Sequence, residues 1–179
     1  MKAFPQLQTQ RFQLRQFSDN DLHNVFAGLS NPEVIKYYGV KYATLEATKE
    51  QMQWFSNLEK TGKGIWWAIC DIEKSTFYGA CGFNDLDKEK RKAEIGFWLL
   101  PEFWGMGIIQ ECLPEILKYA FEELKLNRIE AFVETENLNS KKVLEKLNFQ
   151  LEKTMKNCEI KDGKLISLDL LILRPQDLI

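Results

Sequence analysis

The sequence has a single histidine, only five prolines and no long apolar run. No apolar segment approaches the roughly 20 residues that a membrane-spanning helix needs, and the N-terminal stretch MKAFPQLQTQRF lacks the apolar core of a secretory signal. The four cysteines (Cys70, Cys81, Cys112 and Cys158) form no CxxC pair. This scatter favours free thiols in a reducing cytoplasm over disulfides, and it predicts no metal site.

Strong charge of either sign is also missing. The chain has 24 basic and 26 acidic residues and a formal net charge of -2, so we expect no general attraction to nucleic acid or to an anionic membrane. Apolar residues make up 45% and charged residues 28%, as in ordinary globular domains. No repeat, low-complexity segment or flexible linker divides the chain, and we expect residues 1–179 to form one domain.

Periodicity predicts a mixture of helices and strands. Strand patterns occur in RFQLRQF, IWWAICDI, TFYGACGFNDL, AEIGFWLL and RIEAFVET, and in a closing hairpin of FQLEKTMKNCEI and LISLDLLIL. Helix patterns occur in SDNDLHNVFAGL, in a segment that starts at an N-cap Thr44 and stops near Gly62, between Ile109 and Leu124, and in NSKKVLEKL. This order predicts a mixed sheet with helices on its faces.

Gly105 and Gly107 lie between the AEIGFWLL strand and the Ile109–Leu124 helix. A strand, a glycine-rich loop and a helix in this order make an anion site, because the first helical N–H groups lack intrahelical partners. The N–H groups of about Met106 to Gln110 would be the donors for a phosphate or pyrophosphate. The alternative interpretation is a tight turn with a glycine N-cap. No GKS/T follows, which excludes a Walker phosphate loop, and the third glycine is missing, which excludes a Rossmann dinucleotide-binding fingerprint.

Three stretches carry a resemblance to a known family: QRFQLRQFSDNDL, AEIGFWLLPEFWGMGI and YAFEELKLNRIEAFVETENLNSKKVLEKLNF. Together they resemble the GNAT superfamily of acyl-CoA-dependent N-acetyltransferases, and more closely its RimJ/RimL-like ribosomal-protein N-acetyltransferase branch. The resemblance covers nearly the whole chain. It implies an α/β (α+β) GNAT fold, with a mixed and mostly antiparallel central sheet of about seven strands. That sheet would be splayed between strands 4 and 5 and would carry helices on both faces.

The resemblance also implies acetyl-CoA as co-substrate, with no metal, and direct attack of a primary amine on the thioester. The implied cofactor-binding residues are Trp98, Leu99, Leu100, Trp104, Gly105, Met106, Gly107, Ile108, Ile109, Gln110, Asn137 and Ser140. The first acceptor class is a protein N-terminal α-amine, as in ribosomal-protein acetylation, and a small amine or a spermidine-like polyamine is the alternative. A non-catalytic acyl-CoA-binding module stays open, as do a monomer and a homodimer.

Direct transfer needs a base for the ammonium proton and an acid for the departing thiolate. The resemblance suggests Glu159, on a late strand, or Glu94, on the central strand, as the base, although either can be a solvated strand carboxylate. Leu144 occupies the position where many relatives have an acidic tyrosine, so Ser140 takes over the acid role, with helix capping as the alternative. The Leu99 N–H is a candidate to polarise the thioester carbonyl.

The region before IWWAICDI often shapes the acceptor pocket in this fold, which makes Tyr37, Tyr38 and Trp54 candidate substrate-binding residues. A basic acceptor would favour an acidic rim, with Asp85, Asp87, Glu134 and Glu136 as candidates. His23, which has no partner motif, is expected to have a surface or structural role.

Some positions depart from the family pattern. Trp104 stands where the general loop motif has Arg or Gln, and Ile109 stands where it has Gly or Ala. Pro114 falls inside a helix pattern and predicts a kink there. Asn148 replaces a glycine, a mild change because asparagine tolerates the left-handed conformation at a helix end.

Overall fold

A computed structural model describes residues 3–73 and 75–178. Its strands are β1 (Leu7–Gln8), β2 (Phe12–Arg15), β3 (Ile65–Asp71), β4 (Phe77–Asp87), β5 (Lys92–Leu99), β6 (Arg128–Glu134), β7 (Gln150–Lys161) and β8 (Lys164–Leu173). Its helices are α1 (Leu22–Leu29), α2 (Pro32–Ile35), α3 (Leu45–Thr61), α4 (Ile108–Glu122) and α5 (Leu138–Lys146), with short 3-10 turns at Asp19–Asp21, Pro101–Phe103 and Pro175–Asp177. No helix in the described ranges is long and apolar enough to cross a bilayer.

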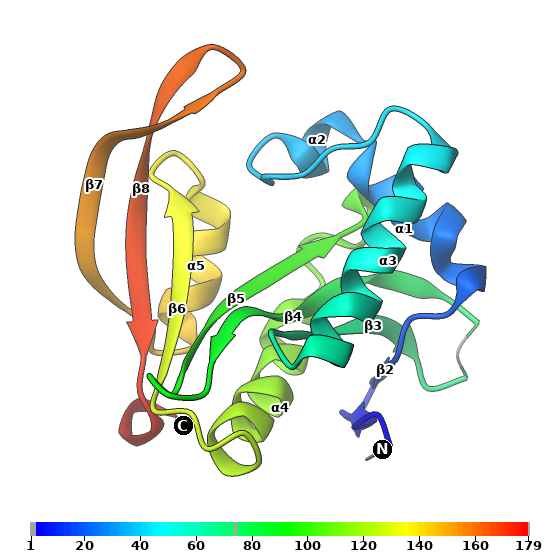
Figure 1. Cartoon of the computed structure of the whole chain (residues 1–179), viewed down its shortest axis with the longest axis horizontal. Coiled ribbons are helices and arrows are strands. Elements are labelled where there is room, and N and C mark those ends of the chain that lie inside the picture. Colours follow the sequence, from blue (N-terminus) through cyan, green and yellow to red (C-terminus); the bar gives the residue numbers. More distant parts are fainter. Residues whose placement is uncertain (1–2, 74, 179) are drawn as a thin grey trace.

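The strands form one sheet in the order β1-β2-β3-β4-β5-β6-β8-β7 (Figure 1). The β5–β6 pair is parallel, and the other neighbouring pairs are antiparallel. The mixed, mostly antiparallel sheet is therefore confirmed. It has eight strands instead of about seven because Leu7–Gln8 adds a two-residue strand at the edge beside β2.

The sheet opens between β5 and β6. Their pairing covers only Lys92–Glu94 against Arg128–Glu130, and beyond it the two ribbons diverge (Figure 1). Because β1 is the extra strand, β5 and β6 are the fourth and fifth strands of the predicted sheet, and the predicted splay lies where we expected it. Strands that separate leave backbone N–H and C=O groups without ladder partners.

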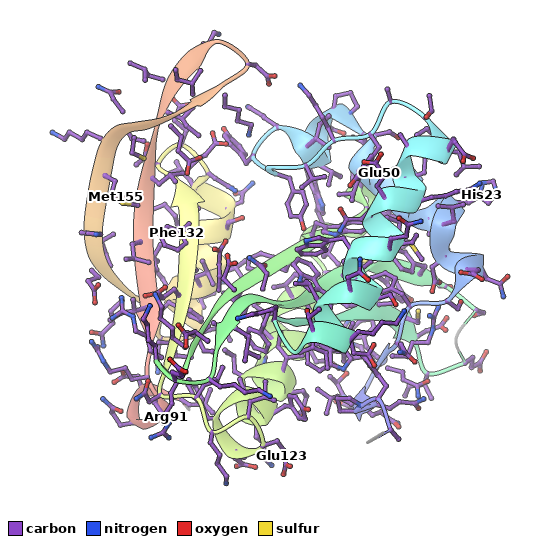
Figure 2. The ribbon with its side chains drawn as sticks, in the orientation of Figure 1. His23, Glu50, Arg91, Glu123, Phe132 and Met155 are labelled. Atoms are coloured by element: carbon purple, nitrogen blue, oxygen red, sulfur yellow. The ribbon has the colours of Figure 1, made fainter. Side chains whose placement is uncertain are left out.

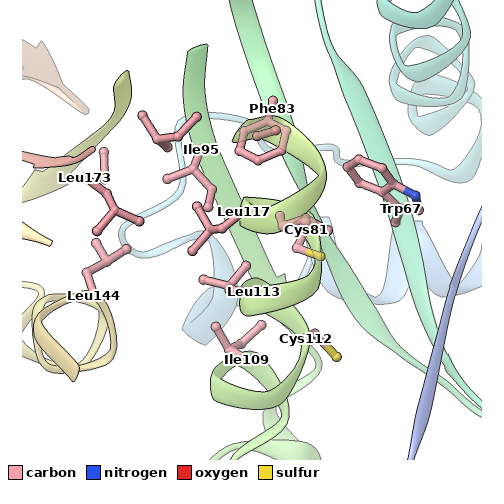
Figure 3. Close-up of a cluster of buried hydrophobic side chains, with 14 of the residues drawn as sticks. Trp67, Cys81, Phe83, Ile95, Ile109, Cys112, Leu113, Leu117, Leu144 and Leu173 are labelled. Atoms are coloured by element: carbon pink, nitrogen blue, oxygen red, sulfur yellow. The ribbon is translucent and has the colours of Figure 1, made fainter. Parts of the chain in front are cut away.

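Helices cover both faces of the sheet, as predicted. α4 and α5 pack on one face, where Leu113, Leu117 and Leu144 meet strand residues such as Ile95 and Leu173 (Figure 3). α1 and α3 cover the opposite face with a second cluster that is rich in aromatic side chains. This two-sided cover explains why the adjacent Trp66 and Trp67, which point to opposite faces, are both buried.

Local chemistry sets the ends of α3. The Thr44 hydroxyl accepts a hydrogen bond from the Ala47 N–H at 3.1 Å, and Gly62 ends the helix with a left-handed φ of 65°. Both predicted boundaries are confirmed. Pro114 lies inside α4, and the kink stays a prediction.

Candidate functional site

The glycine loop between β5 and α4 requires its glycines for conformation. Gly105 has φ +77° and Gly107 has φ +72°, both in the left-handed region that L side chains rarely adopt. Gly107 is also the N-cap residue of α4. The glycine N-cap and the candidate anion site are therefore the same feature, because the N-cap is where the unpaired helical N–H groups and the positive end of the dipole lie.

The side chains of the loop are divided between core and solvent. Ile108 and Ile109 are buried in the cluster under α4, so only their backbone N–H groups can serve a ligand. Ile109 stands where the general loop motif has Gly or Ala, but its side chain is buried in the core and does not occupy the loop. Trp104 and Met106 are 45% and 54% exposed, and the Trp104 indole N–H donates to the Leu99 carbonyl at 3.0 Å.

Arg11 and Glu111 hold the loop from the side, a contact that the sequence did not predict. Arg11 Nη2 donates to the Met106 carbonyl at 3.1 Å, and Arg11 Nε lies 2.6 Å from Glu111 Oε2. Glu111 also accepts from the Thr9 hydroxyl at 2.6 Å. Burial alone would raise the pKa of Glu111, but hydrogen bonds from Thr9 and Arg11 keep that pKa below its ordinary value.

β5 presents backbone rather than side chains to the splay. The Leu100 N–H donates to Tyr78 of β4 at 2.9 Å. Because N–H directions alternate along a strand, the Leu99 N–H points the other way, towards β6. Trp98 is 4% exposed and its ring packs 5.9 Å from the ring of Phe77, so the Trp98 side chain belongs to the core. The predicted contributions of residues 98–100 are thus restricted to their backbones.

Glu94 lies where β5 and β6 part. It is the last β5 residue in the parallel pairing, and its side chain is half-buried. The pKa of Glu94 is raised to about 7, chiefly by burial and then by the negative charges of Asp85, Glu130 and Glu159, while a hydrogen bond from Asn84 acts in the opposite direction. A carboxyl group with a pKa near 7 exchanges protons readily at neutral pH.

Glu159, the other candidate base, is exposed on the edge strand β7 opposite Ile166. Its charge contributes to the raised pKa of Glu94. The structure therefore brings the two carboxylates within electrostatic range of each other, although they come from opposite sides of the splay. Their environments differ, because only Glu94 is withdrawn from water.

Aromatic side chains lie on the side of the sheet that Glu94 faces. Burial first, and then the charge of Glu94, raise the pKa of Tyr38, which places that phenol near the carboxyl. Trp54, 37% exposed on α3, meets Trp66 edge-on at 5.9 Å between ring centroids. Tyr38 and Trp54 thus gather on the side of the sheet that Glu94 faces, which suits their predicted role in substrate binding.

Trp66 was missed as a member of this group. Its ring lies across two glycines of neighbouring strands: a Cβ on Gly82 would be 2.5 Å from Trp66 Cγ, and one on Gly96 would be 2.7 Å from Trp66 Cη2. Gly96 shares a strand face with Glu94 because side chains alternate with period two. The indole N–H groups of Trp66 and Trp98 are buried and have no partner in the part of the chain that the structure describes.

Charged side chains connect the end of β7 and the β7–β8 turn to the segment after α2. Both segments lie towards the top of Figure 1. Lys161 forms an ion pair with Glu134 and donates to the Lys36 carbonyl at 2.6 Å. Lys41 Nζ lies 2.7 Å from Asp162 Oδ1. We call these contacts the hairpin bridge. It connects the strand of Glu159 to the segment of Tyr37, whose ring centroid is 6.0 Å from Lys161 Nζ, and it neutralises Glu134 of the predicted acidic rim.

The N-terminus of α5 carries the other predicted residues. Asn137 is the N-cap, and its side-chain oxygen accepts from the Ser140 N–H at 3.2 Å. The capping interpretation is confirmed for Asn137, and its cofactor role stays a prediction. The Ser140 hydroxyl is half-buried and has no hydrogen-bond partner among the described residues. Leu144 is 1% exposed in the core.

The remaining candidates lie elsewhere. His23 is exposed on α1, far from β6 (Figure 2), which confirms a surface position. Two surface hollows are lined by residues such as Asn148 and Gln176 in one case and Lys63 and Asp87 in the other. Neither is lined by a residue of the glycine loop or of β5.

Known proteins resemble this chain in sequence and in fold. The family profile described as "Acetyltransferase (GNAT) domain" matches residues 11–150. The uncharacterized N-acetyltransferase YoaA of Bacillus subtilis is 36% identical over 161 residues, which cover 89% of this chain and 91% of YoaA.

Two solved structures share the fold. RimL, a ribosomal L7/L12 alpha-N-protein acetyltransferase in complex with coenzyme A, superposes with a TM-score of 0.84 at 20% identity, covering 93% of this chain and 95% of RimL. Spermidine N-acetyltransferase from Vibrio cholerae, in complex with CoA and spermine, gives 0.82 at 18% identity, covering 93% and 96%. At these identities the likeness concerns the fold.

Proposed function

The chain belongs to the GNAT acetyltransferase family, and we propose that it moves an acetyl group from acetyl-CoA directly to a primary amine. The proposed acceptor is a protein N-terminal α-amine of the ribosomal-protein type. We take residues 1–179 as one catalytic domain. The observation that carries the proposal is the half-buried Glu94 carboxyl, which lies at the opening of the sheet and has a pKa of about 7.

Acetyl-CoA would bind with its pyrophosphate on the Trp104–Gln110 loop. The left-handed glycines and the start of α4 support this placement, because they present N–H groups to an anion. The pantetheine arm would run along the backbone of residues 98–100, which β6 leaves unpaired. Asn137 and Ser140, at the start of α5, would flank the thioester end.

Proton transfers set the roles of the polar groups. The acceptor ammonium gives a proton to Glu94, and the free amine attacks the thioester carbonyl carbon, with the Leu99 N–H donating to the carbonyl oxygen. A C–N bond forms and the C–S bond breaks. The departing thiolate takes a proton from the Ser140 hydroxyl, which takes in its place the proton that the attacking nitrogen loses as the amide forms, and Glu94 releases its own proton to solvent. Acetylated amine and CoA are the products.

Glu94 is a better base than Glu159 because burial, not only neighbouring charge, raises its pKa. Glu159 is exposed on an edge strand, and such a carboxylate suits attraction of a cationic acceptor more than proton transfer. We therefore keep Glu159 as the alternative base and assign it first to electrostatic attraction.

A small amine or polyamine is the second candidate acceptor. Negative charge from Asp85 and Glu159 and aromatic surfaces from Tyr37, Tyr38 and Trp54 suit a cation. The solved relatives with this fold include one enzyme named for ribosomal L7/L12 and one named for spermidine, so both acceptor classes have precedent on this fold. A non-catalytic acyl-CoA-binding module would bind the cofactor and transfer no acetyl group.

The test is acetylation of a defined panel, read by mass spectrometry. The purified full chain and acetyl-CoA are mixed with a lysine-free peptide that has a free N-terminus, with the same peptide blocked at its N-terminus, and with spermidine. We expect the free peptide to gain one acetyl group, and Glu94→Gln to lower kcat by about 100-fold or more. Glu122→Gln, an exposed change at the end of α4, is the matched control. Cofactor binding without any acetylated product would favour the non-catalytic module.

Compartment and assembly complete the proposal. The free thiols Cys70, Cys81 and Cys112 are buried, and Cys158 is exposed and free, a set that suits a reducing cytoplasm. The enzyme would act there as a monomer or a homodimer, which light scattering at assay concentration distinguishes.

A further inference from the structure

We propose that Arg11 is a phosphate-binding residue of the acetyl-CoA site and supplies the positive charge that the glycine loop itself lacks. This inference rests on the proposed function, because it concerns the same cofactor. It adds a residue that immediately precedes β2 and is distant in sequence from the loop.

The loop from Trp104 to Gln110 contains no basic side chain. Its first residue is Trp104, whose single donor is already used on the Leu99 carbonyl. Apart from the uncharged side-chain amide of Gln110, the loop thus offers a phosphate only backbone N–H groups and the partial charge of the α4 dipole. Any full positive charge at this site therefore comes from outside the loop.

Arg11 lies at the required place. Its Nη2 is 3.1 Å from the Met106 carbonyl oxygen and 3.9 Å from where a Cβ of Gly107 would be. Its side chain is 51% exposed, so the guanidinium borders both the loop and solvent. Nε is bonded to Glu111 and one Nη2 hydrogen to Met106, which leaves three of the five N–H groups without a partner among the described residues.

Glu111 fixes the direction of those free donors. It receives Arg11 Nε at 2.6 Å and the Arg11 backbone N–H at 2.9 Å, which holds the guanidinium against the first turn of α4. The Phe12 ring packs against the guanidinium group of Arg11, whose Cζ is 4.7 Å from the ring centroid. An oriented guanidinium is suited to phosphate because its fork of donors matches the phosphate oxygens. Glu111 is accordingly a positioning residue.

The experiment is a titration of the full chain with CoA and with 3'-dephospho-CoA, for Arg11→Met and for the control Lys118→Met. Lys118 is an exposed cation on α4 with no ion pair within the described ranges. We expect Arg11→Met to weaken CoA binding by roughly tenfold at low salt and Lys118→Met to leave it unchanged. A similar loss with both ligands assigns Arg11 to the pyrophosphate, and a loss with CoA alone assigns it to the 3'-phosphate. Equal affinities of Arg11→Met and the unchanged protein would overturn the inference.

Two further readouts separate charge from folding. The loss should shrink as salt rises, because an exposed charge is screened; a loss that persists unchanged at 1 M NaCl would point to a distorted loop and would overturn the inference. Glu111→Gln serves as the background for a double variant. If Arg11 only neutralised Glu111, adding Arg11→Met to Glu111→Gln would cost nothing further, and the direct role would be wrong. Failure of the unchanged protein to bind CoA would instead remove the proposed function itself.

Discussion

Glu94 and Glu130 are paired across β5 and β6 at the last register position before the two strands separate. Their environments push their pKa values apart. Glu130 is buried, which would raise its pKa, but hydrogen bonds from Lys92 at 2.9 Å and Arg128 at 2.7 Å hold it below its ordinary value. Glu94 has no such cation among the residues that the structure describes, and its pKa rises to about 7. One carboxylate of the pair is thus structural, and the other is free to exchange protons.

This asymmetry predicts the pH dependence of catalysis. A base acts only when deprotonated, so kcat/KM should rise as pH increases through about 7, the pKa of Glu94. In Glu94→Gln the remaining rate should follow ionisation of the acceptor itself, near pH ~8 for an α-amine. Rates of acetyl transfer between pH 5.5 and 9 measure both profiles. An unchanged limb near pH 7 in Glu94→Gln would exclude Glu94 as the titrating base.

The same residue should cost stability at neutral and basic pH. At pH 4 the Glu94 carboxyl is protonated in both the folded and the unfolded chain, so there is no penalty. Between 4.5 and about 7 the unfolded chain loses its proton while the folded chain keeps it, so stability falls with rising pH across this window.

Glu94→Gln removes that penalty. The shift from 4.5 to about 7 sets an upper limit of about 3 kcal/mol, and with solvent screening we expect about 1–2 kcal/mol of extra stability at pH 8 and little at pH 4. Urea unfolding of the variant and the unchanged protein at the two pH values measures this difference. Equal gains at both pH values would mean that the amide acts through packing and not through ionisation.

The sequence predicted features whose causes are local. Both ends of α3 were expected at Thr44 and Gly62, because capping depends on the residues beside the helix end. The position of the splay came from the family resemblance, since periodicity identifies strands but does not show which of them separate. The two-residue β1 carries too short a pattern to be recognised.

Contacts between segments that are distant in the chain could not be predicted from the sequence. Arg11 meets Met106 across 95 positions and Lys161 meets Lys36 across 125, and a lone basic residue gives no sign of such a partner. The choice between Glu94 and Glu159 also stayed open because burial depends on what packs against a strand. Both lie in half-apolar strands, and only the fold makes one half-buried and the other exposed.

Replacement of Gly107 should weaken both the fold and the cofactor site. At φ +72° an L side chain costs about 1–2 kcal/mol, although the nearest atoms to a new Cβ are at 3.9 Å, so there is room for it. Gly107→Ala should therefore lose stability through the backbone and lose CoA affinity through the altered N-cap. Gly39→Ala is the control, because a Cβ there meets nothing within 4 Å and its φ is not left-handed. Equal CoA affinity in the two variants would argue against a phosphate site at the start of α4.

The hairpin bridge should affect the acceptor and not the cofactor. Lys161→Met removes the cation between Glu134 and the Lys36 carbonyl and leaves Lys41 and Asp162 as the remaining contact of the bridge, so the tie between the Tyr37 segment and the end of β7 weakens. Lys164→Met is a matched control, because Lys164 is the register partner of Lys161 across the same turn and is exposed. We expect Lys161→Met to raise the KM of the acceptor several-fold, while the Kd of CoA stays unchanged.

Hydrogen exchange measures the same bridge without any acceptor. In Lys161→Met, amides in residues 36–42 and 158–165 should exchange faster than in Lys164→Met, whereas those of the glycine loop should not change, because the loop is held by Arg11 and Glu111 instead. If exchange accelerated around the bridge while the acceptor KM stayed constant, the bridge would be a structural tie that lies outside the acceptor site. If both changed together, the segment of Tyr37 would belong to the surface that the acceptor contacts.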